Sequence, residues 1–341
     1  MTLPIAIVGA GGYTGQELVE LTLGHPSLKL EALFGSSQTE GVPFDELCPR
    51  LRGCTDLVVA ETSAAAIAET GAKHVFLATP HELSMTLAPE LVELGITVFD
   101  LSGAFRLSEL SLYPKHYDFT HSSPSSVESA LYAIPELCRA KLPSAKLVSL
   151  AGCYATSVIL PVKPLVGAGL LDKSRPVVAD SVSGISGAGK KASATTSFCE
   201  VSPTPYGVFT HRHTPEMIEH AGTDVIFTPH LGPYKRGILS TIHADLARGI
   251  DRARIENALQ AAFADSPFVR LLPEGQWPSV NAVAHTNMVD IGFAVDESRQ
   301  HLILVSAIDN LLKGASGQAV QALNIHMGWD ETLGFSTRGR A

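Results

Sequence analysis

Apolar runs alternate with amphipathic stretches in the first part of the chain. Residues 3–26 predict a strand, a glycine turn and a helix whose apolar face includes Leu18 and Val19. Further strands are expected at residues 28–37, 74–80 and 96–103. A helix is expected at residues 81–95, where Gly95 ends it. This alternation is typical of a parallel, doubly wound sheet, which binds ligands beyond the carboxyl ends of its strands.

The pattern changes after Cys153. A strand followed by a Gly/Ser-rich loop is expected at 176–193, and a helix at 250–267. Strands of a more antiparallel sheet are expected at residues 223–232, 236–247, 287–297 and 301–309. Residues 310–329 predict a turn and a helix that returns to the first domain. We therefore expect an α/β chain with a Rossmann-type domain at 1–152, completed by 310–341, and an α+β domain with a mixed or antiparallel sheet at 153–309.

Composition narrows the class of protein. The 341 residues are 45% hydrophobic and 17% charged, which suits two domains. A net charge of −9 without any Lys/Arg cluster argues against a nucleic-acid partner. The N-terminal residues lack the features of a signal peptide, and no apolar run approaches the roughly 20 residues of a membrane span, so we expect a soluble, cytoplasmic protein with no membrane partner.

The cysteines are few and scattered. They are Cys48, Cys54, Cys138, Cys153 and Cys199. Their odd number and the absence of a CxxC pair argue against a disulfide framework or a structural zinc site. Free thiols suit a reducing compartment.

The first glycine turn follows a strand and opens a helix. Glycine lets the backbone approach a pyrophosphate, and the helix N-terminus offers N–H groups to it. The turn departs from G-x-G-x-x-G because Thr14 holds the place of the third glycine and Gly15 follows. This context favours a dinucleotide site over a mere tight turn.

The end of the second expected strand bears on the choice of cofactor. An NAD enzyme usually carries an acidic residue there for the ribose 2′-hydroxyl. This strand instead ends in Gly35, Ser36 and Ser37, with Glu31 in mid-strand. The two serines could donate to a 2′-phosphate, which favours NADP(H), although they could also be ordinary turn residues.

Cys153 follows Gly152 where an apolar run gives way to a helix. The positive end of a helix dipole favours a thiolate, and the glycine leaves open space beside the sulfur. Free cysteine is also among the residue types most often buried in cores. The residues alone leave the nucleophile and the core residue equally open.

The segment "YGVFTHRHTPEM", residues 206–217, gathers His211, Arg212, His213 and Glu216. A thiol needs one imidazole as its base, and an anionic substrate needs a cation. If the segment is extended, the two histidines share one face and Arg212 the other. The sequence has no further Cys, Asp or His at a spacing suited to binding a metal together with these histidines, so no metal site is expected. A solvated polar loop is the alternative.

Two further segments suit anions. Residues 181–193 contain glycines and hydroxyls that suit an anion-binding nest, and Lys190 and Lys191 within them add positive charge, although such loops are common. Arg106, just after the fourth expected strand, suits bidentate binding of phosphate or carboxylate, or else a surface ion pair. Together with the thiol, the imidazoles and the dinucleotide turn, they indicate an acyl or aldehyde oxidoreductase that forms a thioester.

Between residues 5 and 328 the chain contains the segments "GAGGYTGQEL", "LSGAFRL", "GCYATSVILPVKPL", "SGISGAGKKAS", "FCEVSPTPYGVFTHRHTPEM", "VIFTPHLGPYKRGILSTI" and "DNLLKGASGQAVQALNI". These seven segments resemble the N-acetyl-γ-glutamyl-phosphate reductase family of the long bacterial type. That family is related in fold to aspartate-semialdehyde dehydrogenase. The resemblance implies reduction of N-acetyl-L-glutamyl 5-phosphate by NADPH to the 5-semialdehyde, with release of phosphate, in arginine biosynthesis. It also implies a homodimer or homotetramer, with the residues 153–309 as the catalytic and dimerisation domain.

The resemblance also implies roles for single residues. Cys153 would be the nucleophile, with His213 the first candidate and His211 the second for acid/base work. Substrate would contact Arg106, Ser183, Gly184, Ser186, Tyr206, Arg212 and Glu216. The cofactor would contact Gly9, Gly11, Gly12, Tyr13, Thr14, Gly15, Ser36, Ser37, Thr79, Pro80, Ser102, Gly187, Ala188, Asn310 and Gly314.

One departure from the family pattern concerns the thiol itself. The family usually reads P-G-C-[YF]-P-T, whereas this chain has Ala151 and Ala155 at the two proline positions. Loss of proline frees two backbone N–H groups, so we expect a looser turn with unchanged chemistry. Three competing hypotheses remain. The chain could catalyse the same reaction on a homologous acyl phosphate, it could be a Cys-His hydrolase or acyltransferase, or it could be a non-catalytic NADP-binding regulator.

Overall fold

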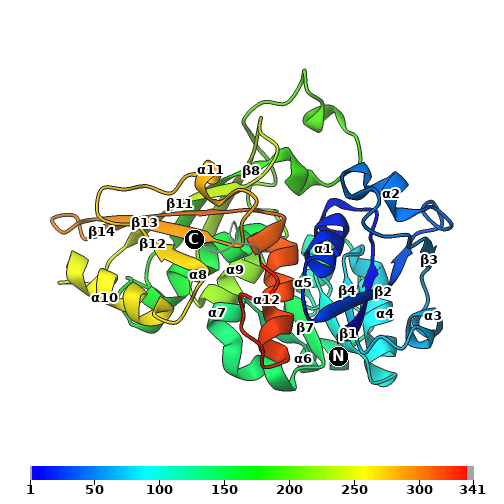
Figure 1. Cartoon of the computed structure of the whole chain (residues 1–341). Helices are drawn as coiled ribbons and strands as arrows, with labels where there is room; N and C mark the ends of the chain where they lie inside the picture. Colours follow the sequence, from blue (N-terminus) through cyan, green and yellow to red (C-terminus); the bar gives the residue numbers. More distant parts are fainter. Residues whose placement is uncertain (1, 336–341) are drawn as a thin grey trace. The chain divides into compact units, whose positions relative to one another are not determined.

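The computed structural model describes residues 2–335 and divides them into two compact units (Figure 1). One unit contains the residues up to Gly152 together with the described residues from Ala315 on, and the other runs from Cys153 to Gly314. Residues 336–341, which the expected first domain includes, lie outside the described residues. Among residues 2–335, no helix is long and apolar enough to cross a membrane.

Within the described residues, the first unit holds a seven-stranded sheet in the order β3-β2-β1-β4-β5-β7-β6. Its strands are β1 Leu3–Val8, β2 Leu28–Gly35, β3 Val59–Glu61, β4 His74–Leu77, β5 Thr97–Asp100, β6 Leu131–Ala133 and β7 Leu147–Leu150. All the strand pairs of this sheet that the structure describes are parallel, which confirms the doubly wound prediction. The chain leaves β1 toward β2 on one side and continues from β4 on the other, so β1 and β4 form the switch point where such sheets bind ligands.

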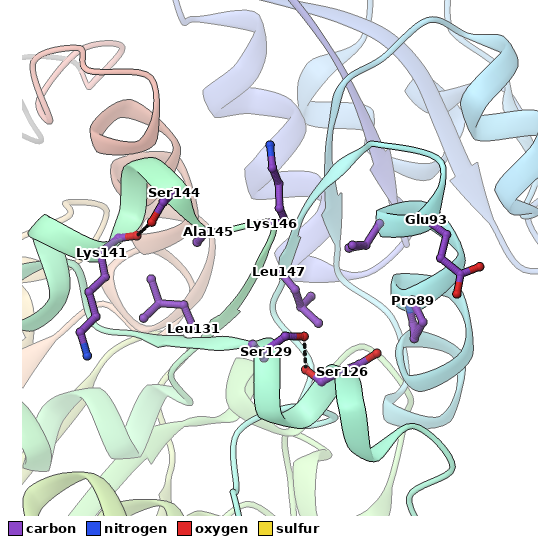
Figure 2. Close-up of a pocket in the computed structure, with 12 residues that line it drawn as sticks. Pro89, Glu93, Ser126, Ser129, Leu131, Lys141, Ser144, Ala145, Lys146 and Leu147 are labelled. Atoms are coloured by element: carbon purple, nitrogen blue, oxygen red, sulfur yellow. Dashed lines mark hydrogen bonds between the residues drawn. The ribbon is translucent and has the colours of Figure 1, made fainter.

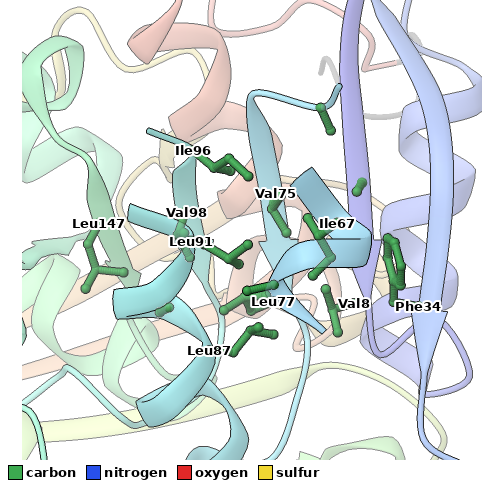
Figure 3. Packing of buried hydrophobic residues seen from close by; sticks show 14 of the residues in the cluster. Val8, Phe34, Ile67, Val75, Leu77, Leu87, Leu91, Ile96, Val98 and Leu147 are labelled. Atoms are coloured by element: carbon green, nitrogen blue, oxygen red, sulfur yellow. The ribbon is translucent and has the colours of Figure 1, made fainter. Parts of the chain in front are cut away.

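The α-helices of this unit before the last one are α1 Tyr13–Leu23, α2 Phe44–Leu47, α3 Ala64–Glu69, α4 His81–Glu93, α5 Leu112–Tyr117, α6 Pro124–Ser129 and α7 Pro135–Cys138, of which α1 and α4 contact the sheet most. The side chain of Ser63 caps α3 by accepting the N–H of Ala66 at 3.1 Å. Figure 3 shows Ile67 of α3 and Leu91 of α4 packed on the strand residues Val8, Val75 and Val98. The apolar periodicity of strand and helix therefore meets in one core.

The last described helix, α12 Gly317–His326, belongs to the first unit. It contacts α1, α7 and the 3-10 helix Arg139–Ser144, and eight of its ten residues are buried. A hydrophobic helix buried on all sides needs partners around it, and these helices supply them. This confirms the prediction that the terminal helix returns to the first domain.

The second unit contains, in the described part of the chain, a seven-stranded sheet in the order β12-β13-β14-β11-β8-β10-β9. Its strands are β8 Val177–Gly184, β9 Thr204–Pro205, β10 Val225–Gly232, β11 Ile238–Asp245, β12 Val269–Leu271, β13 Val289–Asp296 and β14 His301–Ile308. Strand β8 runs parallel to β10, and β12 parallel to β13, while the other pairs are antiparallel. The sheet is mixed, which confirms the α+β prediction.

The helices of the second unit are α8 Cys153–Gly167, α9 His213–Ala221, α10 Arg252–Phe263 and α11 Val280–Val283. Helix α8 contacts β11, β14, α9 and α10, so it lies at the centre of this unit. Asp251 caps α10 by accepting the N–H of Arg254 at 2.9 Å. The position of α8 determines where Cys153, its first residue, is held.

Candidate active site

The glycine turn lies at the switch point of the first sheet. Gly9 follows β1 with φ +87°, and a Cβ there would come 2.2 Å from the carbonyl oxygen of Ala78, just beyond β4. A Cβ on Gly15 would come 2.2 Å from the carbonyl oxygen of Gly9. Only glycine fits at both positions, because a side chain would strike backbone. With Gly11, Gly12, Tyr13 and Thr14 between them, they form a compact turn into α1.

Ser36 and Ser37 are exposed in the turn that follows β2. The backbone carbonyl of Ser36 accepts the N–H of Thr39 at 2.8 Å, which closes this turn. Glu31 lies in mid-strand and its carboxylate pairs with Lys29 at 2.7 Å. The end of β2 therefore presents hydroxyl groups rather than a carboxylate.

A buried carboxylate that sequence reasoning missed organises the next two strand ends. Asp100, the last residue of β5, is fully buried, and its oxygens accept from the hydroxyls of Ser84 at 2.8 Å and Ser102 at 2.7 Å. The hydroxyls of Ser84 and Thr79 lie 2.6 Å apart. Burial raises the pKa of Asp100, and these hydrogen bonds oppose the rise. The network fixes Thr79, Ser102 and the backbone beside Pro80 at the ligand edge of the sheet.

Arg106 is buried, with 6% of its surface exposed. Its Nε donates to the carbonyl of Leu150 and its Nη2 to the carbonyl of Leu101, both at 2.8 Å. The guanidinium therefore ties the loop after β5 to the end of β7. This burial excludes a surface ion pair, the alternative reading from the sequence.

Cys153 is partly exposed and begins the fifteen-residue helix α8, as the sequence pattern predicts. A chain of hydroxyls anchors this helix to its sheet: the hydroxyl of Ser157 lies 2.7 Å from that of Ser240 on β11, which lies 2.6 Å from that of Ser181 on β8. Ser306 of β14 donates to the carbonyl of Ser157 at 2.5 Å. Because all four serines are fully buried, the helix start is fixed by bonds that water does not reach.

The two alanines at the expected proline positions differ in their surroundings. The N–H of Ala151 donates to the carbonyl of Ala133 at 3.1 Å, a bond that proline could not make. Ala155 is fully buried in the first turn of α8, where backbone N–H groups have no partner within the helix. The N–H that replaces proline at Ala151 is therefore hydrogen-bonded, and the expected loosening of the turn stays a prediction.

Several predicted residues gather around the start of α8. A Cβ on Gly314 would come 2.7 Å from the Cβ of Cys153, so the backbone there lies directly against the thiol residue. The Asn310 side chain donates to the hydroxyl of Ser186 at 3.0 Å and accepts the N–H of Gly237 at 2.6 Å. Buried Ser183 and Gly184 end β8, and Gly187 and Ala188 are exposed in the segment that follows it.

The histidine segment is helical from His213 on, so the extended conformation considered from the sequence is wrong. The two imidazoles nevertheless meet, because the Nδ1 of His211 accepts the N–H of His213 at 3.1 Å and the ring centroids lie 4.9 Å apart. Arg212 between them is exposed, whereas Glu216 is fully buried. Burial and then the charge of Arg212 lower the pKa of His211 to about 4.

Tyr154, the residue after the thiol, links these histidines to Cys153. Its ring packs edge-on against His211, with centroids 5.5 Å apart, and its hydroxyl donates to the carbonyl of His230 at 2.9 Å. The hydroxyl of Tyr206 donates to that of Tyr154 at 3.3 Å. Burial raises the pKa of both phenols, and the charge of Cys153 adds to the rise, so the thiol lies near both. Tyr154 was not predicted, although its place beside the cysteine was the available signal.

Other features lie apart from this site. A cavity of about 590 Å³ is lined by Leu131 and Leu147, the first residues of β6 and β7, and by Lys141 and Lys146 (Figure 2). It is therefore at the amino edge of the first sheet, whereas the glycine turn is at the carboxyl edge. Among residues 2–335, no group of three or more His, Cys, Asp or Glu could hold a metal ion.

The chain matches family models and solved structures along most of its length. Residues 4–145 match the model of the semialdehyde dehydrogenase NAD binding domain, and residues 153–310 that of the semialdehyde dehydrogenase dimerisation domain. Aspartate semialdehyde dehydrogenase II from Vibrio cholerae, complexed with ASA, shares the fold with a TM-score of 0.73 and 17% identity, over 96% of this chain and 99% of that chain. The enzyme from Candida albicans with NADP has a TM-score of 0.68 and 15% identity, over 95% and 98% of the two chains.

Curated relatives are much closer in sequence. N-acetyl-gamma-glutamyl-phosphate reductase from Escherichia coli K12 is 48% identical over 328 residues, which is 96% of this chain and 97% of that protein. The protein of the same name from Tolumonas auensis is 46% identical over 337 residues, 98% and 99% of the two chains. Together with the two domain models and the shared fold, these matches show that the chain belongs to the N-acetyl-γ-glutamyl-phosphate reductase family of oxidoreductases.

Proposed function

We propose that the chain reduces N-acetyl-L-glutamyl 5-phosphate to N-acetyl-L-glutamate 5-semialdehyde with NADPH, releasing phosphate, in arginine biosynthesis. The observation that carries the proposal is the cysteine at the start of α8, with Gly314 against it and two imidazoles linked to it through Tyr154. The names and coverage of the relatives supply the substrate.

NADPH fits the first unit on two observations. A Cβ at Gly9 or Gly15 would strike backbone, so glycine at these two positions permits the tight entry into α1 that a pyrophosphate cradle requires. The turn after β2 offers Ser36 and Ser37 with no carboxylate at the strand end, which suits a 2′-phosphate. When bound, NADPH supplies the hydride for the reduction. Thr79, Pro80 and Ser102 would hold the rest of the cofactor at the same sheet edge.

Cys153 would carry the acyl group. At a helix N-terminus the positive end of the dipole favours the thiolate, which attacks the acyl carbon and forms a C–S bond as the C–O bond to phosphate breaks. The inorganic phosphate leaves and a thioester remains. After hydride transfer, the C–S bond of the thiohemiacetal breaks, the aldehyde leaves and the thiolate is restored.

A histidine would move the protons of these steps. Burial and the charge of Arg212 lower the pKa of His211 to about 4, so its imidazole is neutral near pH 7, where it is a weak base and lacks the acidic proton of an imidazolium. His213 is buried, lies against His211 and begins α9, so it remains the first candidate. His211 would then orient its neighbour by accepting the backbone N–H of His213.

The residues proposed to contact substrate differ in how exposed their side chains are. Arg212 is exposed and Tyr206 has 41% of its surface exposed, so both are available to an anionic substrate. Ser186 would offer a hydrogen bond from the loop after β8, whereas Ser183 and Gly184, the last residues of β8, are buried and would contact substrate only if this strand end opened. Arg106 would act from a buried position through its charge. Glu216 is fully buried, which argues against a direct substrate contact.

The proposal includes a homo-oligomer. Helix α8 covers one face of the mixed sheet, while the opposite face carries partly buried apolar residues, including Val178, Val182, Leu239 and Ile303, beside polar ones such as Asp180, Thr241 and His243. A second copy of the chain would cover this face, as the name of the matched dimerisation domain suggests. Sedimentation equilibrium should give a dimer or larger assembly that Leu239→Lys dissociates; a monomeric wild-type protein would contradict this.

The reverse reaction tests the activity. With N-acetylglutamate semialdehyde, phosphate and NADP, we expect rapid formation of NADPH, and much slower reaction with NAD or with aspartate semialdehyde. A pocket discriminates one methylene by only about 1–3 kcal/mol, but the acetamido group adds polar contacts that aspartate semialdehyde lacks. Equal rates with both aldehydes, or faster reaction with NAD, would overturn the assignment of substrate or cofactor respectively.

A further inference from the structure

One fully buried carboxylate in the second unit has four partners. Asp309 directly follows β14. Its Oδ1 accepts the backbone N–H groups of Leu311 at 2.8 Å and Leu312 at 2.9 Å. Its Oδ2 accepts the N–H of His285 at 2.6 Å and the Nε of Arg236 at 2.5 Å. None of these groups belongs to the histidine segment or to the thiol.

These bonds shape the turn that meets the thiol residue. Oδ1 holds the first two N–H groups of the turn that leads into the π-helical segment Leu312–Ser316. The backbone carbonyl of Asp309 accepts the N–H of Gly314 at 2.9 Å. Gly314 is thereby fixed where a Cβ would come within 2.7 Å of the Cβ of Cys153. The carboxylate and the thiol are thus connected through a single tight turn.

The other oxygen fixes the opposite side of the same region. Arg236, held by Oδ2, precedes Gly237, whose N–H donates to the Asn310 side chain at 2.6 Å. A Cβ on Gly184, the last residue of β8, would come 2.5 Å from the backbone nitrogen of Arg236, and the N–H of Ser186 donates to the carbonyl of Lys235 at 3.1 Å, so the loop after β8 packs directly on this segment. One carboxylate therefore orders both the turn against Cys153 and the loop proposed to bind substrate.

We propose that Asp309 is a positioning residue for the thiol step. It contacts neither substrate nor thiol, and acts by holding Gly314 against Cys153 and Arg236 beside the loop after β8. An ionised carboxylate can accept all four bonds, whereas asparagine offers one oxygen and turns an N–H donor toward other donors. The inference rests on the proposed function only where turnover is measured.

Asp309→Asn is expected to lower kcat roughly tenfold to a hundredfold, since small displacements of reacting groups have effects of this size. The affinity for NADPH should fall much less than kcat, because the glycine turn belongs to the other unit and only Asn310 and Gly314 among the expected cofactor contacts lie on the displaced turn. The rate at which iodoacetamide alkylates Cys153, followed on its peptide by mass spectrometry, should change severalfold. That rate requires no turnover, so it reports on the thiol even if the proposed reaction is wrong.

Asp290→Asn is the matched control. Asp290 is also buried in the second unit and pairs with the Nε of Arg270 at 2.6 Å. Its loss should lower thermal stability in a similar way, while kcat and the alkylation rate of Cys153 stay at wild-type values. Equal effects of both variants on the alkylation rate, or a wild-type rate in Asp309→Asn, would overturn the inference.

Gly314→Ala tests the same contact if Asp309→Asn does not fold. The added Cβ must push the turn away from Cys153, so kcat and the alkylation rate should both change. Where both variants fold, their effects on the alkylation rate should be less than additive in the double variant, because both act through one contact. Wild-type alkylation in Gly314→Ala, or full additivity, would contradict the proposal.

Discussion

Cys153→Ser is expected to lower reductase turnover by roughly 10⁴-fold or more, the scale on which loss of a covalent nucleophile acts. A serine hydroxyl is not ionised near pH 7. The helix N-terminus is too weak to close the gap between the pKa of a hydroxyl and that of a thiol. The fold should survive, because the exchange of sulfur for oxygen changes volume little at a partly exposed position. Steady-state kinetics and a fluorescence titration with NADPH measure the two properties separately.

The matched control for this variant is Cys138→Ser. Cys138 is also partly exposed, and its thiol donates to the carbonyl of Ile134 at 3.3 Å within the first unit. Its replacement should leave turnover within about twofold of the wild type, as expected for a surface substitution away from the site. Loss of NADPH binding together with turnover in Cys153→Ser would show instead that Cys153 is structural.

His213→Asn is expected to lower turnover by about 10²- to 10⁴-fold, the usual contribution of a positioned acid or base. Asparagine preserves hydrogen bonding and approximate size but cannot carry the proton. His211→Asn should have a smaller effect, because an imidazole whose pKa lies near 4 is a weak base and is not available as an acid at the working pH. The comparison is made on kcat, with circular dichroism as the check that both variants are folded.

The pH dependence of stability separates the two histidines further. The pKa of His211 is lowered below its ordinary value of 6.5, so the unfolded chain binds this proton more readily than the folded one. Its contribution to stability is present above about pH 6.5 and is lost as the pH falls toward 4. His211→Asn should therefore flatten the loss of stability in this window.

Unchanged turnover in His213→Asn would contradict the assignment of the acid/base role to His213 and would move that role to His211.

The sequence predicts the parts of the fold that repeat a period. Strands of four to eight residues and long helices such as α4 and α8 carry enough alternation to be found. Strands β3, β6, β9 and β12 have only two or three residues, too few to show a period, and the sequence pattern missed them. The start of α8 at Cys153 was predictable because an apolar strand and a glycine precede it.

The site was predictable as a set of residue types but not as a network. Tyr154 and Asp309 were missed because their roles depend on hydrogen bonds to partners distant in sequence, such as His230 and Arg236. Asp100 was missed for the same reason, although a carboxylate at the end of an apolar strand is itself unusual. The hydrogen bond of Ala151 shows that a departure from a family pattern can be compensated by the backbone.

Trapping the acyl group tests the central claim most directly. The protein is mixed with N-acetylglutamyl phosphate without NADPH, quenched in acid and digested for mass spectrometry. We predict release of about one phosphate per chain and an N-acetylglutamyl thioester on the peptide that contains Cys153, which disappears when NADPH is added before the quench. Turnover with NADPH but no adduct on Cys153, or an adduct on another residue, would contradict the account.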